Sequence, residues 1–215
     1  LTNFGASEYV VAWNGDVIDQ FTLQQQDAKQ VDGPSGPGTQ HTLVGLSSQG
    51  LEKTVQITLL ERHPTLALAQ VTYTNPSDSQ IKLRKWTSHA YTLSATGSQP
   101  AFWSYQGASF EDRRDWVLPL EPGFEQRNYM GMNASDYGSG TPVVDIWRRD
   151  AGLAVGHVEL TPKLVSLPVA VSAAGAQLHI ELEKPAALDR GQSLPTLQTF
   201  LPGHRADYYG SLVAY

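Results

Sequence analysis

Apolar and polar residues alternate with a period of two along much of the chain. This pattern is typical of strands that bury one face and expose the other. The clearest runs are residues 51–59 and 177–183, where leucine, valine and isoleucine are separated by polar or charged residues. The valines and leucine of residues 165–171 predict one more strand.

Three turns between such runs predict β-hairpins. Asn14-Gly15 is the strongest signal, because both central residues of a type I′ turn need a positive φ. The other two are residues 75–78, between 66–74 and 81–86, and residues 149–152, between 143–148 and 153–159. Eight or more antiparallel strands follow, so we predict an all-β fold, a large antiparallel β-sandwich.

Three stretches depart from this pattern. Residues 32–38 are rich in glycine and proline, which predicts a loop. Residues 95–142 carry aromatics and charges with little alternation, which indicates long ordered loops of functional or interfacial character. Tyr208, Leu212 and Tyr215 stand at helical spacing. We therefore predict a sandwich domain over residues 1–204 and a short helix over 205–215 that leads into another domain.

Composition excludes several classes of function. The net charge is −6 and there is no basic run, so neither nucleic acid nor an anionic membrane surface is an expected partner. The apolar stretches are far shorter than the roughly 20 residues of a membrane span. The chain has no cysteine, which excludes disulfides, thiolate catalysis and cysteine metal sites.

Motif searches identify no cofactor site. Phosphate loops, dinucleotide fingerprints, the Gly-x-Ser-x-Gly elbow and His-Glu-x-x-His are all absent. His157 and Glu159 share one face of a predicted strand, as metal ligands can, but a third ligand is not evident. We read them as a polar pair on a sheet face and predict no metal and no cofactor.

Aromatic, charged and amide side chains concentrate between residues 103 and 159, chiefly in 104–116 and 128–140. Tryptophan and tyrosine offer flat apolar faces for the C–H side of a sugar ring, and Asp, Asn and Arg sort hydroxyls by orientation. The same side chains also suit a contact between domains or ordinary packing. All three interpretations stay open at the level of composition.

Two stretches carry a family resemblance. Residues 68–81 (LAQVTYTNPSDSQI) resemble the paired strands of galactose-mutarotase-like supersandwich domains, in which an apolar strand, Thr-Asn, a turn and the next strand recur. Residues 140–159 (GTPVVDIWRRDAGLAVGHVE), together with 128–137 (NYMGMNASDY), are similar to the amino-terminal domain of bacterial glycoside hydrolases related to family 36, the α-galactosidase or melibiase group.

The resemblance implies a role without catalysis. In that group a β-supersandwich precedes a (β/α)₈ barrel whose strands hold both catalytic aspartates. We therefore assign no catalytic residue to this chain, expect it to be inactive alone, and expect the barrel after residue 215. The expected partners are that barrel and, through the full-length enzyme, a galactoside-like carbohydrate. Our candidates for the edge of the sugar pocket, by position, are Arg113, Asp115, Trp116, Asp136 and Tyr137.

Two other functions remain as alternatives. One is a stand-alone carbohydrate-binding protein. The other is a mutarotase-type epimerase, with His89 as acid and Glu159 or Glu181 as base, although Pro76 stands where the mutarotase pattern has its histidine. A domain that packs on a barrel also predicts an uncovered apolar patch with Tyr208, Leu212 and Tyr215 poorly buried.

The sequence leaves other properties open. The sugar and its linkage, the compartment (secreted or periplasmic export would suit a polysaccharide-degrading bacterium) and the oligomeric state, a homo-oligomer included, are not determined by these residues.

Overall fold

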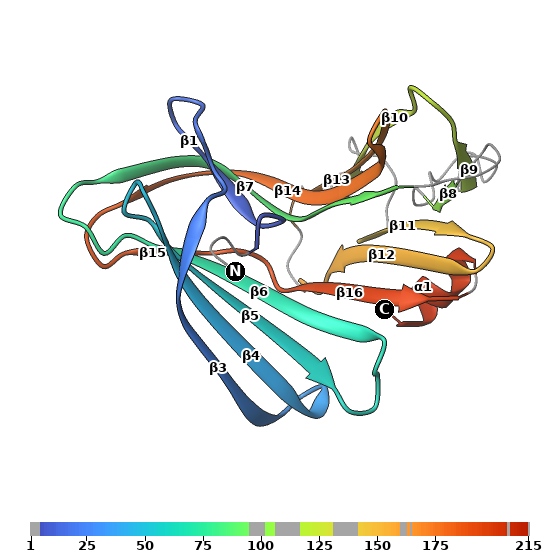
Figure 1. Cartoon of the computed structure of the whole chain (residues 1–215), viewed down its shortest axis with the longest axis horizontal. Coiled ribbons are helices and arrows are strands. Elements are labelled where there is room, and N and C mark those ends of the chain that lie inside the picture. Colours follow the sequence, from blue (N-terminus) through green and yellow to red (C-terminus); the bar gives the residue numbers. More distant parts are fainter. Residues whose placement is uncertain are drawn as a thin grey trace. The chain divides into compact units, whose positions relative to one another are not determined.

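The computed structural model describes residues 5–94, 102–105, 117–130, 142–159, 163, 165–205 and 207–214. Its regular elements are antiparallel strands and one short helix, α1 (Tyr208–Ala214) (Figure 1). The predicted all-β sandwich with a short carboxy-terminal helix is confirmed. In the part of the chain that the structure describes, no helix is long and apolar enough to cross a membrane.

The chain divides into two compact units. The first unit comprises Leu1–Ser88 and Leu182–Gln198, and the second comprises His89–Glu181 and Thr199–Tyr215. Strands β7 (Ile81–Leu93) and β14 (Gly175–Leu188) contribute residues to both units.

Long antiparallel strands dominate the first unit. They pair in the order β3 (Phe21–Gly33), β4 (Gly36–Ser47), β5 (Glu52–Leu60) and β6 (Leu66–Thr74), and β15 (Ser193–Pro195) also pairs with β6. In the other sheet, β1 (Tyr9–Ala12) pairs with β2 (Val17–Ile18) and with β7. The predicted hairpin at Asn14-Gly15 is confirmed. Its turn is not of type I′, because Gly15 has a positive φ of 94° and Asn14 does not.

A lysine lies in the core of the first unit. The Lys53 side chain is fully buried, and its amine donates hydrogen bonds to the backbone carbonyls of Gly5 (2.6 Å) and Glu8 (2.9 Å). The same amine lies 4.0 Å from the centroid of the Phe21 ring. Burial lowers the pKa of Lys53 to about 8, against the opposing attraction of the Glu8 and Asp19 carboxylates.

The prediction of a loop over residues 32–38 is wrong. Strand β3 ends at Gly33 and strand β4 begins at Gly36, and these two residues pair across a two-residue turn. Gly36 has a φ of 94°, a conformation that a glycine adopts without strain. At Gly38 a side chain would overlap the backbone carbonyl of Leu59. Glycine is therefore used here for a tight turn and for close pairing, which composition alone cannot distinguish from a loop.

The hairpin predicted between residues 66–74 and 81–86 is also wrong, because β6 and β7 belong to different sheets. The chain turns a corner at Asn75, whose side chain is fully buried. Its amide donates to the carbonyls of Ser79 and Leu188, both at 2.8 Å, and its carbonyl accepts from Ser77. These bonds stabilise a change of sheet rather than a return along the same sheet.

The second unit contains two antiparallel series. One has the order β9 (Val117–Leu120), β8 (Phe102–Tyr105), β11 (Val143–Arg148), β12 (Ala151–His157) and β16 (Thr199–His204). The other joins β10 (Glu125–Met130), β13 (Val165–Ser172) and β14. The predicted hairpin of residues 143–159 is confirmed, with Arg148 opposite Ala151. The expectation of loops over 95–142 is wrong where β8, β9 and β10 lie.

Candidate functional site

The structure leaves the predicted sugar-contacting residues untested. All five candidates for the pocket edge lie outside the described residues: Arg113, Asp115, Trp116, Asp136 and Tyr137. Tyr215, which was expected in the exposed patch of the terminal helix, lies outside them as well. The described residues offer other candidates for a functional site, which are the polar and aromatic clusters of the second unit.

His89, the acid of the epimerase hypothesis, is a buried and neutral residue. It lies in β7 at a φ of 56°, a left-handed conformation that is uncommon for residues other than glycine. Its Nε2 is 2.7 Å from the Thr199 hydroxyl and its Nδ1 is 3.2 Å from the Tyr91 hydroxyl. Burial lowers the pKa of His89 to about 4, so the ring holds no extra proton to donate near neutral pH.

The two carboxylates proposed as its base are held by cations. Glu181 forms a 2.9 Å ion pair with Arg127, and Glu159 forms a 2.6 Å ion pair with Lys163. A neutral, enclosed histidine and two ion-paired glutamates do not make the acid–base pair that ring opening at C1 would need. The arrangement argues against the epimerase hypothesis.

His157 lies two residues before Glu159, the other member of the predicted polar pair. Its ring is buried at the end of β12, and burial lowers its pKa. Neither ring nitrogen has a hydrogen-bond partner among the described residues. Within those same residues, no three His, Asp or Glu side chains gather to hold a metal ion.

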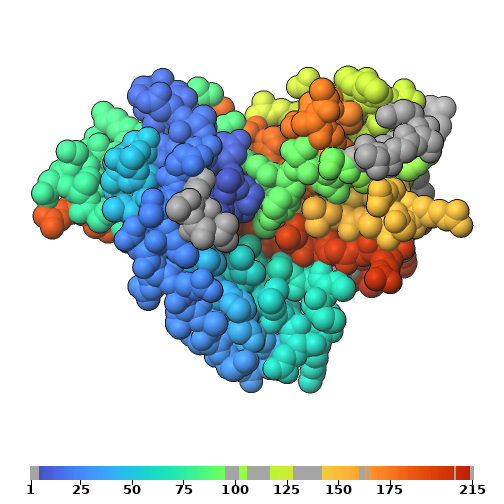
Figure 2. All heavy atoms as spheres, in the orientation of Figure 1, coloured from blue at the N-terminus to red at the C-terminus, as the bar shows by residue number. Residues whose placement is uncertain are grey.

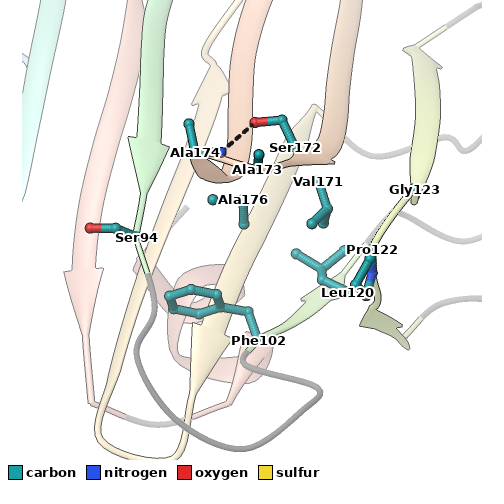
Figure 3. A pocket seen from close by; sticks show the side chains of 11 residues that line it. Ser94, Phe102, Leu120, Pro122, Gly123, Val171, Ser172, Ala173, Ala174 and Ala176 are labelled. Atoms are coloured by element: carbon teal, nitrogen blue, oxygen red, sulfur yellow. Dashed lines mark hydrogen bonds between the residues drawn. The ribbon is translucent and has the colours of Figure 1, made fainter.

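A hollow of about 510 Å³ opens beside β13 and β14 (Figure 3). Phe102, Leu120 and Val171 lie around it, with small residues from the turn between the two strands. Its hydroxyl groups come from Ser94 and Ser172, and Ser172 accepts a hydrogen bond from the Ala174 amide. None of its described lining residues is titratable, so they offer no group for acid–base chemistry.

A buried pair of ionisable side chains in the second unit lies under α1. Asp145 of β11 is fully buried, and the Nε2 atom of His204 in β16 is 3.0 Å from each of its carboxylate oxygens. Burial raises the pKa of Asp145, while hydrogen bonds with His204 and Ser211 oppose that rise. Ser211 belongs to α1 and also donates to the Tyr208 carbonyl at 2.7 Å.

Aromatic rings hold the same helix on the sheet. The Tyr208 ring stacks on Tyr105 of β8, with centroids 5.1 Å apart and planes 6° apart, and lies 5.7 Å from Trp147 of β11. Packing of this kind adds to the free energy of burial. Together with the Asp145–His204 pair, it fixes one face of α1.

The opposite face of α1 carries exposed apolar side chains. Tyr209 is 66% exposed and Val213 is 70% exposed, four residues further along the same face. The expectation that Tyr208 and Leu212 would be poorly buried is wrong, since both are half-buried. The spacing predicted the helix, but the rings of Tyr105 and Trp147 decide which of its faces points inward.

Sequence reasoning did not identify Asp145 and His204. One signal was available, because Asp145 interrupts an otherwise apolar run from Val143 to Trp147. A charged residue within a buried strand needs a partner. That partner is 59 residues away in the sequence, and no local pattern points to it.

Comparisons with known proteins agree with the fold. No protein-family model matches the sequence, and no curated protein matches it. Among solved structures, the α-galactosidase from Lactobacillus brevis matches 93% of this chain with a TM-score of 0.71 at 14% identity. The GH36 α-galactosidase AgaA from Geobacillus stearothermophilus matches 93% with a TM-score of 0.65 at 15% identity.

A related activity also appears among the similar structures. The α-N-acetylgalactosaminidase NagBb from Bifidobacterium bifidum matches 99% of this chain with a TM-score of 0.61 at 10% identity. The resemblance to the α-galactosidase group is thus confirmed at the level of the fold. This chain spans 29%, 30% and 33% of the length of these three proteins, so each match concerns one part of a larger chain.

Proposed function

We propose that this chain is a non-catalytic, amino-terminal domain of an α-galactosidase-like glycoside hydrolase that packs on a catalytic barrel. The observation that carries the proposal is the match of 93% of the chain to 29–30% of two α-galactosidase chains. A domain of that share leaves most of each similar chain outside the match.

The chemistry of the described residues supports an accessory role. The buried histidine His89 is neutral near pH 7, and Glu159 and Glu181 are both engaged by cations. The hollow beside β13 has no titratable residue among its described lining. Glycoside hydrolysis needs two carboxyl groups on either side of a bound sugar, and none of these clusters supplies them.

The exposed face of α1 supports a docking role for the second unit. Tyr209 and Val213 lie on a helix whose other face is fixed by Tyr208 and by the polar cluster under it. An apolar face on a firmly held element costs little ordering entropy when a partner covers it. In this proposal the barrel covers that face, and the residues from Arg113 to Tyr137 named above lie near its sugar pocket.

The test compares this chain with a longer one. Hydrolysis of 4-nitrophenyl α-galactoside is measured for residues 1–215 and for a chain extended through the following coding sequence. We expect activity in the longer chain alone. Activity in the 215-residue chain would contradict the proposal, and inactivity of both would favour the stand-alone carbohydrate-binding alternative.

Variants of the longer chain test the docking surface. Replacing Tyr209 and Val213 by serine should lower its melting temperature and its activity, because the contact with the barrel loses two apolar side chains. Leu59→Ser is the matched control, since Leu59 is also an exposed apolar residue but lies in the first unit. If Leu59→Ser lowered the melting temperature and the activity as much as the double serine variant, the proposed contact between this face and the barrel would be contradicted.

A further inference from the structure

The hairpin between β1 and β2 presents an unusually exposed indole. Trp13 is 63% exposed, and it follows directly after β1. The amino-terminal part of the chain, to which this hairpin belongs, is blue in Figure 2. Burying an aromatic ring is among the largest sources of packing free energy, and this ring contributes little of it. Its position therefore calls for a role outside the core.

Trp13 borders a hollow of about 390 Å³ in the first unit. This volume lies in the lower part of the range of small-ligand sites, roughly 300–1,000 Å³. Amide, carboxylate and ammonium side chains share the lining with the indole. They are Asn14, Asp16, Gln49, Gln80 and Lys82.

The hairpin holds this surface in one conformation. The Trp13 amide donates to the Lys82 carbonyl at 3.0 Å, which ties the turn to β7. The Asn14 side chain donates to the Asp16 carboxylate at 2.7 Å and accepts from the Asp16 amide at 3.1 Å. Gly15 provides the positive φ that the turn requires. A ligand would thus meet a preformed surface and lose little affinity to its ordering.

The polar groups of the hollow retain capacity for a ligand. An ionised carboxylate has about four acceptor positions, and Asn14 occupies one of those on Asp16. The Gln80 amide nitrogen donates to Asp189 at 2.8 Å, which orients its carbonyl group. Planar acceptors and donors fixed beside an apolar ring match the alternation of hydroxyl groups and C–H bonds around a pyranose.

We propose that the hollow beside Trp13 binds a pyranose ring of a carbohydrate. The indole stacks on the apolar C–H face of the sugar, while Asp16 and Gln80 bind its hydroxyl groups and Lys82 borders the site. A protein interface is less well matched, since a stable one needs a wide apolar centre with few charges. This site lies within the first unit and does not depend on the role proposed for α1.

Titration of sugars into the ¹⁵N-labelled 215-residue chain tests this proposal. Methyl α-D-galactopyranoside, methyl α-D-glucopyranoside and raffinose are added separately, and the indole N–H signals of the five tryptophans are followed. We expect at least one sugar to shift the Trp13 signal with a Kd in the millimolar range, as one small site allows. No shift of that signal by any of the three sugars at 50 mM (~50-fold above a 1 mM Kd) would overturn the proposal.

Three variants separate stacking from nonspecific effects. Trp13→Ala should weaken binding at least tenfold, and Trp13→Tyr should retain part of it, because tyrosine keeps an aromatic face. Trp103→Ala is the matched control, since Trp103 is also exposed but lies in the second unit, and it should bind as the unchanged chain does. Equal binding by the Trp13→Ala variant would overturn the proposal.

One further outcome would replace the sugar by a second copy of the chain. Signals of Trp13 that shift with protein concentration in the absence of sugar, and not in the Trp13→Ala variant, would overturn carbohydrate binding in favour of self-association. Failure here is distinguishable from failure of the proposed function, because the hydrolysis comparison uses the longer chain and a different substrate site.

Discussion

The imidazole of His204 reaches the carboxylate of Asp145 across an intervening strand. Their strands, β16 and β11, pair on opposite sides of β12, and the Nε2 atom of His204 is nevertheless 3.0 Å from the carboxylate. Gly152 lies opposite His204 in β12, and a side chain there would overlap the ring. The absence of a side chain at Gly152 therefore provides the path for this contact.

Substitution of Gly152 by alanine should separate that pair. The added methyl group would overlap a ring that cannot swing away without leaving Asp145, so we expect a loss of about 1–3 kcal/mol in the free energy of unfolding. Gly203→Ala is the matched control, because Gly203 lies next to His204 in β16 and a methyl group there meets no atom within 4 Å. Urea denaturation measures both. A Gly203→Ala loss as large as that of Gly152→Ala would contradict this explanation.

Removal of the buried carboxylate should loosen α1. In Asp145→Ala, His204 is left enclosed without its anionic partner, and we expect a loss of at least about 2 kcal/mol in the free energy of unfolding. Hydrogen exchange of the α1 amides should accelerate. Arg84→Ala, which breaks the exposed ion pair with Glu183, should cost less than about 1 kcal/mol. Unchanged exchange in α1 would show that the pair does not hold the helix.

The stability of the protein should fall on acidification because of His89. Its pKa is about 4 in the folded chain, against 6.5 for an ordinary solvent-exposed histidine, so between these pH values the unfolded chain binds the extra proton. The contribution of His89 to the free energy of unfolding is therefore complete above pH 6.5 and decreases as the pH falls towards 4. The contribution of this one group is about 3 kcal/mol.

Two variants assign this pH dependence to the imidazole. His89→Asn removes the titrating ring, and asparagine tolerates the left-handed backbone at this position, so the variant should lose stability less steeply between pH 6.5 and 4. Tyr91→Phe removes a hydroxyl partner of His89 but keeps the ring, and should retain the slope. Chemical denaturation at a series of pH values gives both slopes. An unchanged slope in His89→Asn would refute the assignment.

Lys53 should produce a second rise in stability with pH, at alkaline pH. Burial lowers its pKa to about 8 from 10.5, so the unfolded chain binds the extra proton between those values. The free energy of unfolding should therefore rise with pH from 8 to 10 in the unchanged chain relative to Lys53→Met. Parallel pH profiles of the two proteins would contradict the lowered pKa. At pH 7, the difference in unfolding free energy between the unchanged chain and Lys53→Met also includes the loss of the two hydrogen bonds from the amine to backbone carbonyls.

Local patterns predicted most of the strands correctly. The alternations at 51–59 and 177–183 lie in β5 and β14, and the hairpins at Asn14-Gly15 and 143–159 form as expected. Their signals are local, because alternation follows from the pleat of a single strand and a tight turn follows from a few dihedral angles. The long hairpin of β3 and β4 was missed, since polar residues on both faces hide the alternation.

The functional surfaces were harder to predict. The sequence directed attention to residues 103–159, whereas the exposed indole of Trp13 stands next to a turn that was read only as a hairpin signal. A tryptophan can lie in a core or at a binding surface, and its exposure distinguishes the two cases. The residue type alone does not reveal that Trp86 and Trp13 differ in exposure. Trp86 is fully buried and Trp13 is not.

The sequence by itself determined the all-β class, the faces of many strands and the presence of a terminal helix, because these depend on the period of the chain over a few residues. Tertiary structure alone decided that β6 and β7 belong to different sheets, that Asp145 meets His204, and that Tyr208 rather than Tyr209 packs on the sheet. The physical reason is that a pattern specifies which side of an element is buried, whereas the identity of the neighbour depends on how distant segments pack together.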